Sequence, residues 1–156
     1  MQKPTHQILY NYSLNLLSRY SKSSPQLKEK LHQKFPEADL ETIEQVITKL
    51  QDTRILQDDT LAKAYAQSLA NKGKSPFEIE IKLRQKKFPL QLIKTTINKL
   101  LPDLNLEETV TTLAEKKIRS LQKFPKPEQK QKLLAFLHRK AFPSAIINTV
   151  VKKLLS

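Results

Sequence analysis

A short signature built around leucine, lysine, phenylalanine and proline occurs three times in the 156 residues. It reads LHQKFP at 31–36, LRQKKFP at 83–89 and LHRKAFP at 137–143. The phenylalanines are 53 and 54 positions apart, and an aliphatic stretch of similar length follows each copy. Near-equal spacing with matching flanks predicts a tandem repeat of about 50 residues.

Apolar residues recur every three or four positions through each repeat, which is the period of an amphipathic α-helix. Proline and cap residues, such as Ser24 and Pro25, divide each repeat into three such stretches, and no stretch alternates as a strand does. We therefore expect an all-α fold of three tandem three-helix repeats, residues 1–52, 53–104 and 105–156. Because one such unit buries only a small core, the repeats should support one another in an elongated, curved array.

Two further patterns concern helix starts. Ser75 and Glu78 stand at the spacing of a capping box. Asp58 and Asp59 could provide acid–base chemistry or hold Mg²⁺, but their place directly before a helical run favours capping of the fourth helix. The leucine and phenylalanine of each signature are expected to close a short helix onto its neighbour, and the proline ends it.

Composition excludes several classes of site. One glycine cannot build a Walker loop or a GxGxxG turn, and the absence of cysteine excludes a thiolate zinc site and a thiol nucleophile. The three histidines, His6, His32 and His138, lie in separate regions. His32 and His138 directly follow the signature leucine, and the second copy has Arg84 at that position, which favours a surface role for both histidines rather than metal binding. We expect no catalytic site, metal or cofactor. No secretion signal or membrane-spanning run is visible, so we expect a cytoplasmic protein.

The net charge of +13 is concentrated toward one end. Residues 1–52 contain seven Lys/Arg and six Asp/Glu, residues 53–108 ten and seven, and residues 109–156 eleven and two. This excess favours an anionic partner over a merely solvated surface, with phosphate contacts rather than base recognition. The candidate binding residues are Lys72, Lys74, Arg84, Lys86, Lys87, Lys116, Lys117, Arg119, Lys130, Lys132, Arg139, Lys140, Lys152 and Lys153.

The order of these motifs resembles the RecX family of regulatory proteins. The second repeat carries the resemblance in ILQDDTLAKAYAQ at 55–67 and Lys-Gly-Lys at 72–74, and the third in FLHRKAF at 136–142. The likeness extends over roughly residues 9–155. In the first repeat the matching residues are Leu14, Leu17, Arg19, Ser24, Leu27, Leu31 and Lys34.

The resemblance implies nine helices in three repeats, with no catalysis. It also implies a protein that binds the recombinase RecA on single-stranded DNA and lies in the groove of the RecA filament. There it would mainly inhibit the ATPase, strand-exchange and coprotease activities of RecA, within homologous recombination, DNA repair and the SOS response. We expect a monomer, with double-stranded DNA as a further candidate ligand.

One departure from the family concerns glycine. RecX proteins commonly have glycine before the hydrophobic residue of each signature, where this chain has Lys34, Lys87 and Ala141. Where such a turn needs a left-handed residue, losing glycine costs about 1 kcal/mol. Either the turns differ here or the chain accepts the strain.

Two other functions stay open. The charge also fits a DNA-binding helical protein that acts without RecA and without sequence specificity, with a steep salt dependence. Alternatively, an adaptor for some other acidic protein would use the surface of the array without nucleic acid.

Overall fold

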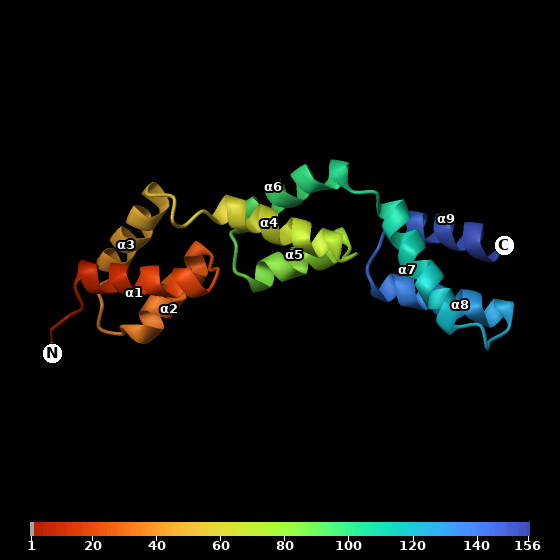
Figure 1. Cartoon of the computed structure of the whole chain (residues 1–156), viewed down its shortest axis with the longest axis horizontal. Helices are drawn as coiled ribbons and strands as arrows, with labels where there is room; N and C mark the ends of the chain where they lie inside the picture. Colours follow the sequence, from red (N-terminus) through yellow and green to blue (C-terminus); the bar gives the residue numbers. More distant parts are fainter. Residues whose placement is uncertain (1) are drawn as a thin grey trace. The chain divides into compact units, whose positions relative to one another are not determined.

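The computed structural model describes residues 2–156, and these form nine α-helices, one 3-10 turn and no strand (Figure 1). The expected all-α class is confirmed, whereas the 3-10 turn at Leu101–Asp103 was not expected. The helices are α1 (His6–Arg19), α2 (Ser24–Lys34), α3 (Leu40–Asp52), α4 (Asp58–Asn71), α5 (Pro76–Gln85), α6 (Leu90–Leu100), α7 (Leu106–Ser120), α8 (Lys126–Arg139) and α9 (Ser144–Leu155).

The residues group into two compact units. The first unit comprises Met1–Tyr65 and Leu83–Lys94, and the second comprises Ala66–Lys82 and Thr95–Ser156. The division passes through α4, α5 and α6. The repeat boundaries at residues 52 and 104 therefore remain a prediction.

Each unit has its own apolar core. In the first unit α1, α2 and α3 pack around the fully buried Leu9, Leu27 and Ile43. In the second unit α7, α8 and α9 pack around an equivalent set that includes Leu133 and Ile147. Burying one such side chain stabilises the fold by about 1.5–3 kcal/mol. The signature leucines Leu31, Leu83 and Leu137 are all fully buried. This confirms their predicted role in the core.

The signature turns of the second and third repeats accept backbone strain. Lys87 and Ala141 have left-handed φ values of 61° and 64°. The Lys87 amide donates to the Arg84 carbonyl (2.9 Å), and the Phe88 amide donates to the Leu83 carbonyl (3.4 Å). This pair of hydrogen bonds is a Schellman motif, which usually has glycine at the left-handed position.

The first signature avoids that strain because it is one residue shorter. Lys34 is the last residue of α2, and the Phe35 amide donates to the Leu31 carbonyl (2.9 Å) in the pattern of an α-helix. No left-handed residue is needed, since Phe35 has a φ of −127°. The shorter turn leaves Phe35 half-buried, whereas Phe88 and Phe142 are only 5% exposed.

The start of α2 differs from the predicted cap by one residue. Ser23, not Ser24, is the N-cap. Its hydroxyl accepts from the Gln26 amide (3.3 Å), and the Gln26 side chain accepts from the Ser23 amide (3.1 Å). These bonds form a capping box. At the start of α5, Ser75 accepts from the Glu78 amide (3.1 Å), as its spacing predicted.

Asp58 caps a different helix from the one expected. It is the first residue of α4, and its carboxylate accepts from the Ser24 amide at the start of α2 (2.8 Å). The Ser23 hydroxyl, in turn, donates to the Lys86 carbonyl (2.8 Å) just after α5. We call these two long-range bonds the α2-start network. A carboxylate at a helix N-terminus satisfies an amide that has no partner in the helix.

Candidate interaction grooves

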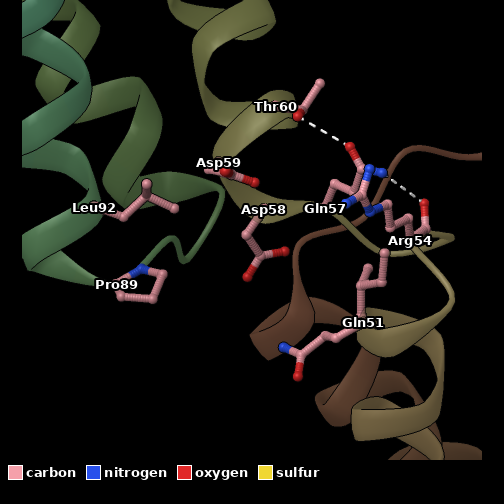
Figure 2. A pocket seen from close by; sticks show the side chains of 9 residues that line it. Gln51, Arg54, Gln57, Asp58, Asp59, Thr60, Pro89 and Leu92 are labelled. Carbon is pink, nitrogen blue, oxygen red and sulfur yellow. Dashed lines mark hydrogen bonds between the residues drawn. The ribbon is translucent and has the colours of Figure 1, made fainter.

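The paired carboxylates line a cavity of about 630 Å³ in the first unit. Figure 2 shows Asp58 between Pro89 and Gln51, with Asp59 beside it. The Asp58 carboxylate is already bonded to the Ser24 amide. Across residues 2–156, no three His, Cys, Asp or Glu side chains gather in a way that could hold a metal ion. Asp58 therefore has a structural role at the start of α2.

Some of the basic side chains of the third repeat line a groove of about 550 Å³ between α7 and α8. Four cations line it, Lys117, Lys123, Lys132 and Arg139, and no carboxylate does. Like charges held together in this way create a positive potential that attracts polyanions. We call it the α7–α8 groove, and its other lining residues are Ser120, Leu121, Phe124, Gln131 and Ala135.

A buried amide shapes the turn beneath this groove. Gln129 is almost inaccessible to solvent, and its side chain donates to the Phe124 carbonyl (2.8 Å). Leu121 is buried at the end of α7, while Phe124 stays half-buried at the wall of the groove. The turn therefore presents Lys123 beside the cations of α8.

Two phenylalanine rings hold the lysines of this region. The ammonium groups of Lys123 and Lys132 lie 5.2 and 4.6 Å from the centre of the Phe124 ring. Those of Lys117 and Lys140 lie 5.0 and 5.6 Å from the centre of the Phe136 ring. Each contact is worth about 0.5–1 kcal/mol at an exposed site. The rings thus position cations and offer less face for stacking a base.

The structure brings together only part of the predicted set. Lys117, Lys132 and Arg139 line the α7–α8 groove, and Lys140 adjoins it through Phe136. Lys123 was missed, because its place depends on the turn after α7. None of the predicted residues is buried. The α7–α8 groove is not lined by the other predicted residues, which are Lys72, Lys74, Arg84, Lys86, Lys87, Lys116, Arg119, Lys130, Lys152 and Lys153.

Several predicted cations have carboxylate partners. The Lys153 ammonium lies 2.5 Å from a Glu107 oxygen, and that of Lys74 lies 3.9 Å from Glu78. Lys87 forms an ion pair with Glu29, and this hydrogen bond and positive charge lower the pKa of the Glu29 carboxyl below its usual value. Lys132 lies 4.0 Å from Glu128. Partnered cations offer less charge to an outside anion.

A second groove, of about 380 Å³, lies in the first unit. Its most exposed large apolar residues are Tyr20 (59%) and Ile55 (45%). Sequence reasoning missed this groove, since the two residues are 35 positions apart. We call it the Tyr20–Ile55 groove, and its other lining residues are Leu17, Ser21, Lys22, Arg54, Leu56, Gln57, Thr60, Leu61 and Ala64.

Backbone geometry after α3 builds this groove. Arg54 has a left-handed φ of 60°, and the amides of Ile55 and Leu56 both donate to the Leu50 carbonyl (2.9 and 3.0 Å). The tight turn leaves Ile55 exposed while Leu56 enters the core. Figure 2 shows Gln57 bonded to the Arg54 carbonyl (2.9 Å), which holds the turn.

These features define a class of protein: an all-α repeat protein with grooves on its surface. None of the helices in residues 2–156 is long and apolar enough to cross a membrane.

Comparisons with known proteins give the family. The family described as "RecX, third three-helix domain" matches residues 106–151. The regulatory protein RecX of Clostridioides difficile (strain 630) is 30% identical over 149 residues, which cover 94% of this chain and 68% of that protein. The crystal structure of RecX from Lactobacillus salivarius superposes with a TM-score of 0.84 at 25% identity, covering 96% of both chains. Another RecX crystal structure gives a TM-score of 0.77 at 24% identity, covering 93% of this chain and 70% of that one.

This chain belongs to the RecX family, as the resemblance of its motifs implied. It is therefore a regulatory protein of the family that regulates RecA, rather than an enzyme.

Proposed function

We propose that this protein binds the RecA filament on single-stranded DNA as a cytoplasmic monomer. It lies in the filament groove and lowers the ATPase, strand-exchange and coprotease activities of RecA, so that it acts in homologous recombination, DNA repair and the SOS response. Membership of the RecX family supports the choice of partner.

The observation that supports a contact with DNA is the set of cations that lines the α7–α8 groove. Its four cations suit a phosphate backbone, and no carboxylate lines it, although Lys132 also lies 4.0 Å from Glu128. Because Lys117, Lys123 and Lys132 also lie over phenylalanine rings, the groove favours backbone contacts without recognition of base sequence. The remaining predicted cations, such as Lys130 and Lys152, contribute to the surrounding positive potential.

The test is the ATPase activity of RecA on single-stranded DNA. Adding the purified protein at stoichiometric ratios to RecA should lower ATP hydrolysis and strand exchange. Bovine serum albumin at the same concentration serves as the control for crowding. Unchanged rates of both reactions would rule out the proposal.

A second candidate is DNA binding that does not involve RecA, favoured by the net charge of +13. The two functions differ in their affinity for naked DNA. Fluorescence anisotropy with labelled single-stranded and double-stranded oligonucleotides should show weak binding that strengthens once RecA coats the single strand. Equal or tighter binding to naked DNA, with a steep salt dependence, would favour the second candidate.

A further inference from the structure

The Tyr20–Ile55 groove differs in chemistry from the α7–α8 groove. Its apolar lining residues, such as Leu17, Leu61 and Ala64, stand beside the uncharged polar Ser21, Gln57 and Thr60. Two cations, Lys22 and Arg54, are its only charged lining residues. A groove with exposed apolar residues and two cations suits a ligand that is apolar at its centre and acidic at its flanks.

A phosphate backbone fits this groove poorly. The neighbouring cavity shares Arg54, Gln57 and Thr60 with the groove, and it also carries Asp58 and Asp59. Two carboxylates beside the rim repel a continuous polyanion, but they leave room for a short segment with one or two acidic residues. The ring of Tyr20 already has the Lys22 ammonium 5.9 Å from its centre, so it is a poor platform for a stacked base.

We propose that the Tyr20–Ile55 groove is a docking site for a protein segment that presents one large apolar side chain flanked by Asp or Glu. The apolar side chain enters between Tyr20 and Ile55, where it covers surface that is now exposed. The flanking carboxylates pair with Lys22 and Arg54 at the rim. This inference goes beyond the proposed RecA function and does not depend on it, because peptides alone test it.

The probes are three labelled pentapeptides with blocked ends, AELEA, AEFEA and AEIEA, with AEAEA and AKLKA as matched controls. Two-dimensional ¹H–¹⁵N spectra of the whole chain report which amides respond, and fluorescence anisotropy gives the affinity. At least one acidic apolar peptide should shift the amides of Tyr20, Ile55 and their neighbours. Both control peptides should bind at least fivefold more weakly.

Variants then locate the site. Ile55→Ser should weaken the binding of the best peptide about fivefold, since it removes about 1 kcal/mol of apolar contact. Lys22→Glu should weaken it further through repulsion. The matched control is Ile8→Ser, because Ile8 is equally exposed (49%) on α1 but does not line the groove. If Ile55→Ser disturbs the fold, Tyr20→Ser replaces it, and the thermal midpoint of each variant is checked first.

Three outcomes would overturn the inference. The first is that none of the three acidic peptides shifts the groove amides. The second is that AEAEA binds as well as the apolar peptides, which would make the contact purely electrostatic. The third is that a twelve-nucleotide oligothymidylate shifts these amides more strongly than any peptide, which would make the groove a nucleic-acid site.

Discussion

The first and third repeats use the same scaffold to carry different surfaces. Each buries its signature leucine completely among three helices. Around the first core, however, cations are balanced by acids: Lys3 pairs with Asp39 (2.7 Å) and Lys28 with Glu44. In residues 109–156, eleven cations face only two acids.

This comparison distinguishes the buried core positions, which specify the fold, from the surface positions, which select a partner. Core positions repeat because a three-helix unit has few ways to exclude water. Surface positions are free to vary, so the third repeat presents a basic groove, whereas the Tyr20–Ile55 groove is lined by residues of the first repeat and the start of the second. Four changes to the chain measure how far this separation holds.

The largest effect is expected in the cores. Leu31→Ala and Leu137→Ala should each destabilise their own repeat by about 2–5 kcal/mol, because each leaves a cavity among buried side chains. Hydrogen exchange read by mass spectrometry should show lost protection in α1–α3 for the first variant and in α7–α9 for the second. Leu40→Ala, at a 66% exposed position, should change protection little. A loss confined to one of the two leucine variants would mean that the cores are not equivalent.

The next effect concerns the α7–α8 groove. Replacing its four cations with glutamine should weaken binding to RecA-coated single-stranded DNA by about one to two orders of magnitude at low salt. The slope of log affinity against log salt should fall by about 3, since each single-strand phosphate contact contributes about 0.7. Anisotropy titrations from low to high salt measure both quantities.

The control for this variant removes the same charge elsewhere. Glutamine at Lys30, Lys34, Lys63 and Lys94, all exposed and outside both grooves, should change the slope much less. If both quadruple variants lose equal affinity, total charge matters rather than the groove.

A smaller effect separates the signature turns. Ala141→Gly should stabilise the protein by about 1 kcal/mol, because glycine adopts the left-handed φ at no steric cost. Lys34→Gly, at the last residue of α2, should instead destabilise it by about 0.5–1 kcal/mol. Urea denaturation with an unchanged m-value measures both. If both substitutions stabilised the protein, the first and third signature turns would not differ in backbone conformation as described.

The smallest effect is expected at the Glu29–Lys87 ion pair. Lys87 lowers the pKa of Glu29, so the pair stabilises the fold above the usual glutamate pKa and stops doing so as pH falls through the lowered pKa. Glu29→Gln should slightly reduce the thermal midpoint near neutral pH and flatten its dependence at acid pH. Because both side chains are exposed, added salt should remove most of the difference. A variant with the pH profile of the parent would mean that the pair contributes nothing.

Periodicity and the repeated signature were enough to predict the helices and their order. The cap of α2 was misplaced because Ser23 and Ser24 can both cap and Pro25 fits either start. Asp58 was assigned to its own helix because its partner, Ser24, is 34 positions away. Local patterns indicate where a helix starts, but they carry no information about which distant amide a side chain will meet.

The binding surfaces were less predictable than the fold. Composition located the excess charge, yet it could not tell Lys117, in the α7–α8 groove, from Lys153, which pairs with Glu107. The Tyr20–Ile55 groove had no local signal, since one residue follows α1 and the other lies between α3 and α4. Such sites depend on how turns bring separate segments together.

The α2-start network means that residues 1–52 do not contain all the hydrogen-bond partners of their own second helix. At the start of α2, the Ser24 amide donates to the Asp58 carboxylate and the Ser23 hydroxyl donates to the Lys86 carbonyl. Both acceptors come after residue 52 in the chain. In a chimera that exchanges residues 1–52 alone, the start of α2 would therefore have to bond to the residues that the other relative has at positions 58 and 86. The compact unit that contains residues 1–52 runs through Tyr65 and includes Leu83–Lys94, so an exchange of repeats in this chain has to follow contacts rather than sequence periods.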